Sequence, residues 1–313
     1  MSSLAFVFPG QGAQQAGMGR ALAEAFSEAR LAFAEADAAL GFALSRLCFE
    51  GPDTDLALTE NTQPAILATS VAALRVLAAR GVRPALVAGH SLGEYSALVA
   101  AGALDFGDAL RVVRSRGRFM QEAVPVGEGA MAAILGLEAA VVSEICSEAA
   151  RGEVVTCANF NEPAQTVIAG HANAVKRAVA LAEARGAKRA IMLQVSAPFH
   201  SPLMAPARAR LEPELAKLDF APLRIPLVTN VNAAPVRSAA AARDALVRQV
   251  DSPVRWVECV QRLAAEGAGT VVEVGPGRVL SGLARRIDKT LALYNVEDPA
   301  SLDKTLAGLG VGS

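Results

Sequence analysis

The sequence has little of several features that would each point to a particular class of protein. Aromatic residues make up only 4% of the 313 positions, which disfavours an all-β sandwich and favours closely packed helices. The formal net charge is −1, so no overall field attracts nucleic acid or an anionic membrane. No apolar run approaches the length of a membrane span, and the N-terminus does not resemble a signal peptide. We therefore expect neither nucleic acid nor a membrane as a partner.

Cysteine is also scarce, with four residues in the whole chain. They are Cys48, Cys146, Cys157 and Cys259. Their spacing matches neither a disulfide framework nor a metal-binding cluster. We expect free, buried thiols, no metal site, and a cytoplasmic location, because thiols persist in reducing compartments.

Apolar residues, by contrast, make up 52% of the chain, which is enough for a sizeable core. Predicted strands and helices alternate up to about residue 123 and again after about residue 202, which indicates a parallel α/β sheet. Between these parts the order is strand, helix, strand, strand, helix, strand, as in a ferredoxin-like unit. We therefore expect a discontinuous α/β domain over 1–127 and 196–313, a ferredoxin-like insert over 128–195, and a cleft between them.

The most informative motif is the pentapeptide Gly89-His90-Ser91-Leu92-Gly93. It lies between an apolar strand predicted over 85–88 and an apolar helix predicted over 92–101. A Gly-x-Ser-x-Gly sequence at such a junction is typical of a nucleophile elbow, which exposes the serine hydroxyl on a sharp turn. The start of the helix adds backbone N–H donors for a developing oxyanion. The motif predicts covalent acyl chemistry and leaves open whether water or another group accepts the acyl.

A serine nucleophile needs a base, and the chain offers three histidines. His90 is adjacent to Ser91 on the turn, so the two side chains should point apart. His171 is expected at a strand-to-helix turn of the insert, as a capping or surface residue. His200 follows the insert, where it can lean over the cleft toward Ser91, although it could instead cap the next helix. No acid between Ser91 and His200 lies at an obvious strand end, so a backbone carbonyl could orient the imidazole.

The helix predicted over 105–123 carries a clue to the substrate. At 100° per residue, Arg111, Arg114 and Arg118 share one face, whereas Arg116 falls within the apolar stripe. A buried guanidinium without an anion costs several kcal/mol. Arg116 could form a structural ion pair with a distant acid, or it could clamp a substrate carboxylate. The second hypothesis implies a dicarboxylic half-thioester as the acyl donor.

Seven motifs in order then define a resemblance. They are Phe8-Pro9-Gly10-Gln11-Gly12, Thr62-Gln63-Pro64-Ala65, Gly89-His90-Ser91-Leu92-Gly93-Glu94-Tyr95, Arg116-Gly117-Arg118-Phe119-Met120, Asn159-Phe160-Asn161-Glu162-Pro163, Pro198-Phe199-His200 and Glu273-Val274-Gly275-Pro276-Gly277. With these, the chain resembles the malonyl-CoA:acyl carrier protein transacylases of fatty acid and polyketide synthesis over nearly its whole length. The resemblance implies a hydrolase-like parallel-sheet core with an inserted ferredoxin-like domain.

The resemblance also implies catalytic roles. Ser91 would be the nucleophile and His200 its base. The main-chain carbonyl of Gln249 would steady the imidazole, which accounts for the missing acid. The backbone N–H groups of Gln11, in the first strand-to-helix loop, and of Leu92 would form the oxyanion hole.

Further residues would bind the substrate. By the same resemblance, Arg116 would grip the malonyl carboxylate. Gln63, Asn161 and Met120 would line the pocket. Phe199 resembles the malonyl-selecting version of its motif, because its bulk should crowd an α-methyl branch.

The implied reaction is a ping-pong transfer from malonyl-CoA to the phosphopantetheine thiol of acyl carrier protein, with no metal or other cofactor. A basic rim should guide the acidic carrier protein. Its candidates are Lys188, Arg189, Arg285, Arg286 and Lys289. Three alternatives stay open: a transferase for methylmalonyl-CoA or another extender, a serine esterase or thioesterase, and a non-catalytic docking module for carrier proteins.

Overall fold

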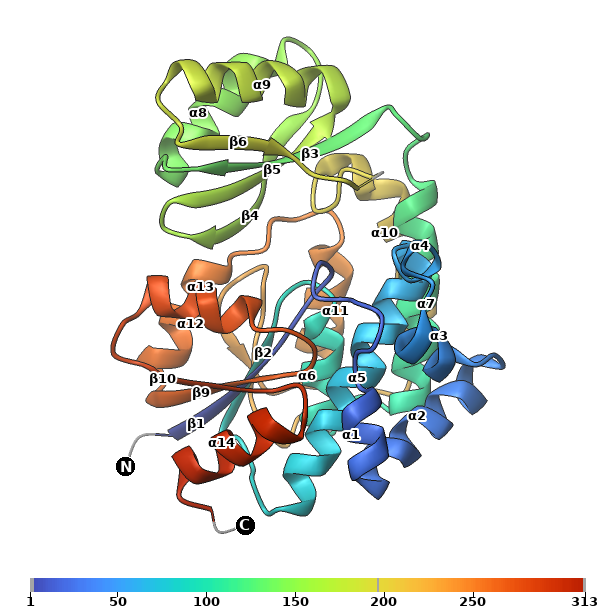
Figure 1. Cartoon of the computed structure of the whole chain (residues 1–313). Helices are drawn as coiled ribbons and strands as arrows, with labels where there is room; N and C mark the ends of the chain where they lie inside the picture. The colour runs from blue at the N-terminus through green and yellow to red at the C-terminus, as the bar shows by residue number, and fades with distance from the viewer. Residues whose placement is uncertain (1–2, 196, 312–313) are drawn as a thin grey trace.

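A six-stranded sheet forms the centre of the larger part of the protein (Figure 1). The computed structural model describes residues 3–195 and 197–311. The sheet order is β10-β9-β1-β2-β7-β8, and all neighbours are parallel except β7 and β8. The strands are β1 (Ser3–Phe8), β2 (Leu86–Gly89), β7 (Leu227–Val228), β8 (Pro235–Val236), β9 (Ala268–Val274) and β10 (Ala292–Val296). Phe8 pairs with Gly89 at the carboxyl ends of β1 and β2, so the loops after these two strands emerge side by side.

Helices cover both faces of this sheet (Figure 1). Successive side chains of β1 point to opposite faces and show which helices lie on each face. Ala5 and Val7 pack with α12 and α13, while Phe6 and Phe8 belong to a larger core that includes α2, α5 and α7. The helices of this part are α1 (Arg20–Ala25), α2 (Ser27–Leu40), α3 (Leu44–Glu50), α4 (Asp53–Leu56), α5 (Thr59–Ala79), α6 (Gly93–Ala100), α7 (Phe106–Glu122), η1 (Pro202–Met204), α10 (Ala205–Lys217), α11 (Ala239–Gln249), α12 (Trp256–Ala265), α13 (Val279–Ile287) and α14 (Pro299–Leu309).

The middle of the chain forms a second, four-stranded sheet, at the top of Figure 1. Its elements are β3 (Gly129–Leu135), α8 (Ala139–Ala150), β4 (Val155–Glu162), β5 (Gln165–His171), α9 (Ala172–Ala184) and β6 (Arg189–Met192). The sheet order is β4-β5-β3-β6 with antiparallel pairs throughout, and the element order is the one predicted. The boundaries between the two domains, at 127/128 and 195/196, stay a prediction. Ser196, at the second boundary, lies outside the described residues.

The two faces of this second sheet have different neighbours. Ala132 and Ile168 pack into a separate core with α8 and α9. Met131 and Val167, one position along each strand, belong instead to the core of the larger part. Because successive side chains of a strand point to opposite faces, one face of this sheet packs against the larger part of the protein.

Helix α5 packs closely against α7. It begins at Thr59, and a Cβ on Gly117 of α7 would lie 2.5 Å from the carbonyl oxygen of Thr59. Contrary to the expectation about apolar runs, its 21 residues are long and apolar enough to cross a membrane. However, 78% of its most apolar window is buried inside the protein, as in the core helix of a globular domain.

Candidate active site

Ser91 lies on a sharp turn between β2 and α6, at the carboxyl end of the central sheet. Its φ angle of 51° is unusual for a residue other than glycine. The flanking glycines have no room for a side chain: a Cβ on Gly89 would lie 1.9 Å from the backbone of Gly93, and one on Gly93 would lie 2.1 Å from the Phe8 oxygen. These contacts explain why the motif needs glycine on both sides of the serine.

His200 lies beside this serine. Its Nε2 is 2.7 Å from Ser91 Oγ, and its Nδ1 is 2.9 Å from the main-chain oxygen of Gln249. The carbonyl can only accept, so Nδ1 carries the proton and Nε2 is free to accept one from the serine. Burial, followed by the positive charge of Arg116, lowers the pKa of His200 to about 3. The imidazole is therefore neutral at physiological pH, as a base must be.

Two backbone N–H groups are available for an oxyanion. Gln11, in the loop after β1, and Leu92, directly after the serine, both line the cavity at Ser91. Within the described parts of the chain, neither backbone N–H donates a hydrogen bond. The N–H of Ser91 itself is occupied, because it donates to Asn230 Oδ1 at 2.7 Å. The free donors are thus the two expected from the sequence.

Arg116 points from α7 into the same site. Only 1% of the residue is exposed, and its guanidinium donates to Gln63 Oε1 at 2.9 Å, to Gln249 Oε1 at 2.8 Å and to Ser91 Oγ at 3.2 Å. Among the described residues it forms no ion pair, and its Nε has no hydrogen-bond partner. The expected alternative of a structural ion pair is therefore absent from this part of the chain. A buried guanidinium that has no ion pair among the described residues and lies 3.2 Å from the serine has the chemistry to bind an anionic group.

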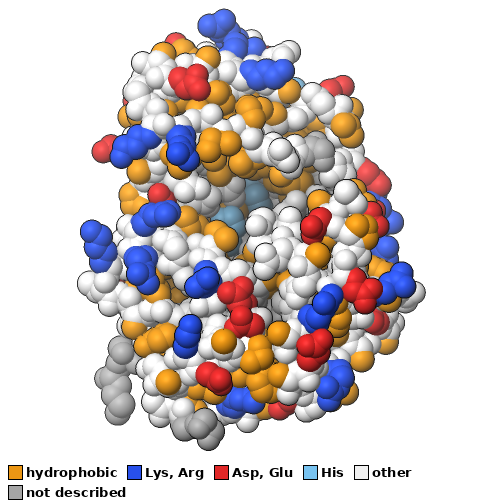
Figure 2. Space-filling model, viewed as in Figure 1, with side chains coloured by type: hydrophobic (Ala, Val, Ile, Leu, Met, Phe, Trp, Pro, Cys, Tyr) orange, Lys and Arg blue, Asp and Glu red, His pale blue; other side chains and the backbone are white. Residues whose placement is uncertain are grey.

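A cavity of about 170 Å³ opens in front of Ser91. Its lining combines residues of the central domain with residues of the second sheet: Gln11, Gln63, His90, Ser91, Leu92, Arg116, Met120, Met131, Asn159, Asn161, Val167, Leu193, Val195, Phe199 and His200. Figure 2 shows histidine side chains deep in the hollow between the upper and lower parts of the molecule. All ten site residues named from the sequence come together here, nine of them in the lining, while Gln249 lies beneath it.

Neighbouring side chains hold the lining residues in place. Gln63 turns its amide oxygen to Arg116 and its amide nitrogen to the sulfur of Met120, at 3.8 Å. Asn161 Oδ1 is 2.9 Å from His90 Nε2, so His90 faces the second sheet rather than Ser91, as expected. Phe199 is 8% exposed and lies one residue before His200.

Two buried residues beneath the elbow were not identified from the sequence. Asn230, after β7, accepts from the backbone N–H of Ser91 and donates to the oxygen of Gly89, both at 2.7 Å. Glu94 accepts from the N–H of Asn230 at 3.2 Å and from Gln249 Nε2. Burial raises the pKa of Glu94 to about 7. Glu94 directly follows the Gly-x-Ser-x-Gly motif, so the sequence could have suggested that it contacts the elbow. Asn230 is distant in sequence, and only the fold brings it beneath the elbow.

The remaining histidine and the cysteines do not line the cavity at Ser91. His171 Nδ1 accepts from the N–H of Val154 at 2.9 Å, so it is a structural residue of the insert. All four cysteines are free and buried, as expected. Among the described residues, no group of three or more His, Cys, Asp or Glu side chains is placed to hold a metal ion.

Comparison with known proteins identifies the family. The "Acyl transferase domain" family matches residues 5–301. Malonyl CoA-acyl carrier protein transacylase of Escherichia coli K12 is 51% identical over 98% of this chain and 99% of its own length. The chain belongs to the malonyl CoA-acyl carrier protein transacylase family.

Other relatives agree with this family assignment. The transacylase of Bacillus subtilis strain 168 is 48% identical over 99% of this chain and 98% of its own length. An acyl carrier protein S-malonyltransferase from Vibrio cholerae superposes with a TM-score of 0.95 at 50% identity, over 97% of this chain and 100% of the other. A malonyl-transacylase solved in complex with a type II polyketide acyl-carrier protein superposes with a TM-score of 0.96 at 49% identity, over 98% and 100% of the two chains. The transacylase family thus accounts for nearly the whole chain.

Proposed function

We propose that this transacylase moves a malonyl group from malonyl-CoA to the phosphopantetheine thiol of acyl carrier protein, through a malonyl ester on Ser91. The observation that carries the proposal is the buried guanidinium of Arg116, 3.2 Å from Ser91 Oγ and without an ion pair among the described residues. A malonyl thioester has a carboxylate close to the carbonyl that the serine attacks. The clamp and the nucleophile are therefore spaced for the two ends of one small dicarboxylic group.

In the first half-reaction, Ser91 Oγ attacks the thioester carbonyl while His200 Nε2 takes the serine proton. The carbonyl oxygen becomes an oxyanion that receives hydrogen bonds from the N–H groups of Gln11 and Leu92. When the tetrahedral intermediate collapses, the C–S bond breaks and His200 returns the proton to the CoA sulfur. The malonyl ester of Ser91 and free CoA remain.

In the second half-reaction, the thiol of the carrier's phosphopantetheine gives its proton to His200 Nε2 and attacks the ester. The C–O bond to Ser91 breaks, and His200 returns the proton to the serine. Chain residues perform each proton transfer, so the mechanism uses no metal or other cofactor. The buried imidazole and the apolar lining disfavour water as a competing acceptor.

Arg116 also connects substrate binding to basicity. Its charge is one of the causes of the low pKa of His200. A bound malonyl carboxylate neutralises much of that charge and so raises the affinity of the imidazole for a proton. The base therefore becomes stronger when the correct acyl group is in place.

The carrier protein needs a docking surface at the mouth of the cavity. All five residues of the expected basic rim are exposed, and Lys and Arg side chains gather along the left flank of the hollow in Figure 2. Near Lys188 and Arg189, the edge strand β6 also exposes Ile191 and Met192, by 46% and 40%. An acidic carrier with an apolar contact helix would match a surface of this kind.

The alternatives make different demands on the site. An esterase or thioesterase would use Ser91 and His200 but has no need of a buried, unpaired Arg116. A transferase for methylmalonyl-CoA needs space beside the α-carbon, where we expect the ring of Phe199 to crowd a methyl branch. The cytoplasmic location fits the four free thiols and stays a prediction.

Intact-mass spectrometry after incubation with malonyl-CoA tests the proposal. The wild type should gain the mass of one malonyl group and release free malonate only slowly. Ser91→Ala should gain none, whereas Ser96→Ala, which alters a fully buried serine of α6 with no hydrogen-bond partner among the described residues, should gain it normally. Rapid release of malonate without a covalent adduct would indicate a hydrolase, and labelling of Ser91→Ala would refute the assigned nucleophile.

A further inference from the structure

A carboxylate is buried directly beneath the elbow, at a place the mechanism above does not use. Glu94 lies in the first turn of α6 and has 0% exposure. One of its oxygens accepts from the N–H of Asn230 at 3.2 Å, and the other accepts from Gln249 Nε2. Within the described parts of the chain, Glu94 forms no ion pair with a lysine, arginine or histidine. Such a group is costly to bury, so its position calls for a reason.

Gln249 is the residue through which this carboxylate reaches the substrate site. Its side-chain nitrogen donates to Glu94 and, at 2.9 Å, to the main-chain oxygen of Ser91. Its side-chain oxygen accepts from Arg116 at 2.8 Å. Its main-chain oxygen accepts from His200 at 2.9 Å. One residue therefore touches the guanidinium, the base and the nucleophile's backbone at once.

The two ends of an amide are chemically different, and this makes the orientation of Gln249 important. If the amide turned over, its NH₂ group would face the guanidinium of Arg116, and two donors would oppose each other. The main-chain oxygen of Ser91 can only accept, and so can the carboxylate of Glu94 in its ionised form, so both bind the NH₂ end of the amide and not the oxygen end. The carboxylate of Glu94 thus acts with the Ser91 oxygen to favour the orientation in which the amide oxygen faces Arg116.

We propose that Glu94 is a positioning residue for malonyl recognition. Its carboxylate fixes the amide of Gln249, and the fixed amide holds Arg116 in line with the carboxylate of the substrate. The inference rests on the proposed function, because it assumes that Arg116 binds the malonyl carboxylate. It adds a determinant of specificity that touches neither substrate nor reacting atoms.

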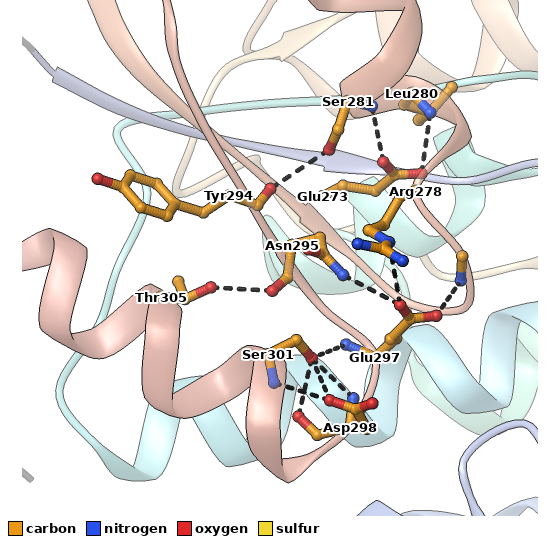
Figure 3. Close-up of polar contacts among 11 residues, drawn as sticks. Glu273, Arg278, Leu280, Ser281, Tyr294, Asn295, Glu297, Asp298, Ser301 and Thr305 are labelled. Atoms are coloured by element: carbon orange, nitrogen blue, oxygen red, sulfur yellow. Dashed lines mark hydrogen bonds and ion pairs between the residues drawn. The ribbon is translucent and has the colours of Figure 1, made fainter.

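Glu273 provides a matched control, because it is also a carboxylate with 0% exposure. It accepts from the backbone N–H groups of Leu280 at 3.0 Å and Ser281 at 2.7 Å, at the start of α13 (Figure 3). Burial raises its pKa to about 7, as it does for Glu94. The two carboxylates therefore share burial and charge and differ in what they hold.

The experiment compares Glu94→Gln with Glu273→Gln in steady-state transfer to acyl carrier protein, with malonyl-CoA and acetyl-CoA as competing donors. Glutamine at 94 can donate as well as accept, so it no longer favours one orientation of the Gln249 amide, which is then held only by the Ser91 oxygen and Arg116. We expect KM for malonyl-CoA to rise about tenfold with kcat within about threefold, which corresponds to about 1.4 kcal/mol of lost binding. The preference for malonyl over acetyl should fall by a similar factor. Glu273→Gln should leave both KM and preference unchanged.

A second variant covers the case in which Glu94→Gln does not fold. Gln249→Met removes both ends of the amide but keeps the main-chain oxygen that His200 contacts, so it should show the same loss of preference. In an Arg116→Ala background, Glu94→Gln should have no further effect on the donor preference, because the residue it positions is gone. Thermal melting and circular dichroism confirm that each compared variant is folded.

The outcomes separate the two proposals. If Arg116→Ala still prefers malonyl-CoA, the proposed role of Arg116 fails, and the role of Glu94 fails with it. If Arg116→Ala loses the preference while Glu94→Gln or Gln249→Met keeps it, only the positioning role of Glu94 is refuted. An equal fall in kcat for both donors in Glu94→Gln, with KM unchanged, would also refute it, because that pattern indicates a purely structural carboxylate.

Discussion

Asn230→Ala should weaken both the stability of the protein and the reactivity of the serine. The side chain is fully buried and satisfies two backbone groups of the elbow, the N–H of Ser91 and the oxygen of Gly89. Alanine removes both hydrogen bonds and leaves both buried groups without a partner. Each orphaned group costs about 1–3 kcal/mol, so the free energy of unfolding should fall by about 2–6 kcal/mol. This is a large part of the roughly 5–15 kcal/mol that stabilises a typical domain.

The same substitution should slow acylation, because the strained turn at Ser91 loses the contacts that hold it. Urea denaturation gives the change in stability, and rapid-quench measurement of malonyl-enzyme formation gives the acylation rate. Asn232→Ala is the control, since that asparagine lies two residues away and is exposed, and among the described residues its side chain accepts a hydrogen bond only from Arg248, at 3.3 Å. Its stability should change by less than about 0.5 kcal/mol. If Asn230→Ala matches this control in stability and acylation rate, the argument from buried polar groups is wrong.

Three further predictions concern selectivity, docking and pH. Phe199→Ser should increase the rate with methylmalonyl-CoA relative to malonyl-CoA in a competition assay, and an unchanged ratio would show that the ring does not crowd the α-carbon. Arg285→Glu should raise KM for acyl carrier protein but not for malonyl-CoA, and should reduce the salt dependence of transfer, whereas a change in KM for both substrates would contradict a docking role. Burial raises the pKa of Glu273 to about 7 from the ordinary 4.5, so this group stabilises the fold below pH 4.5 and the contribution is lost as the pH rises to about 7. Wild type should therefore lose up to about 3 kcal/mol relative to Glu273→Gln between pH 4.5 and 7.5, and a pH-independent difference in urea denaturation would refute this.

The periodic parts of the chain could be read from the sequence. Helix α7 was predicted within one residue at each end, because its apolar stripe gives a clear periodic signal. In the structure the Asp105 side chain caps it by accepting from the N–H of Asp108. The order of elements in the insert was also correct. Helices α3, α4, α13 and α14 and strands β8 and β10 were not predicted, and the shortest of them give little periodic signal. The segment up to Leu40 contains two helices, α1 and α2, which are divided at Phe26, whose φ and ψ of −129° and 130° are extended.

The residues of the site also differ in whether the sequence alone could reveal them. Local motifs identified Ser91, and helix geometry identified Arg116, because both signals lie within a few neighbouring residues. The carbonyl of Gln249 came only from the family resemblance, since a main-chain contact leaves no mark in side-chain identity. Asn230 contacts the elbow 139 residues away in sequence, and no pattern in one chain shows a pairing at that distance.

The second sheet has a consequence for how this enzyme can change. Met131 and Val167 line the cavity from one face of that sheet. Ala132 and Ile168, on its opposite face, pack in the core of the insert with α8 and α9. The reacting groups at Ser91 and His200 belong to a different part of the chain. Substitutions on the cavity face can therefore retune which acyl group is accepted without disturbing either the insert's core or the proton transfers. On this face of the pocket, the residues that shape the space for the acyl group are thus different from those that transfer protons.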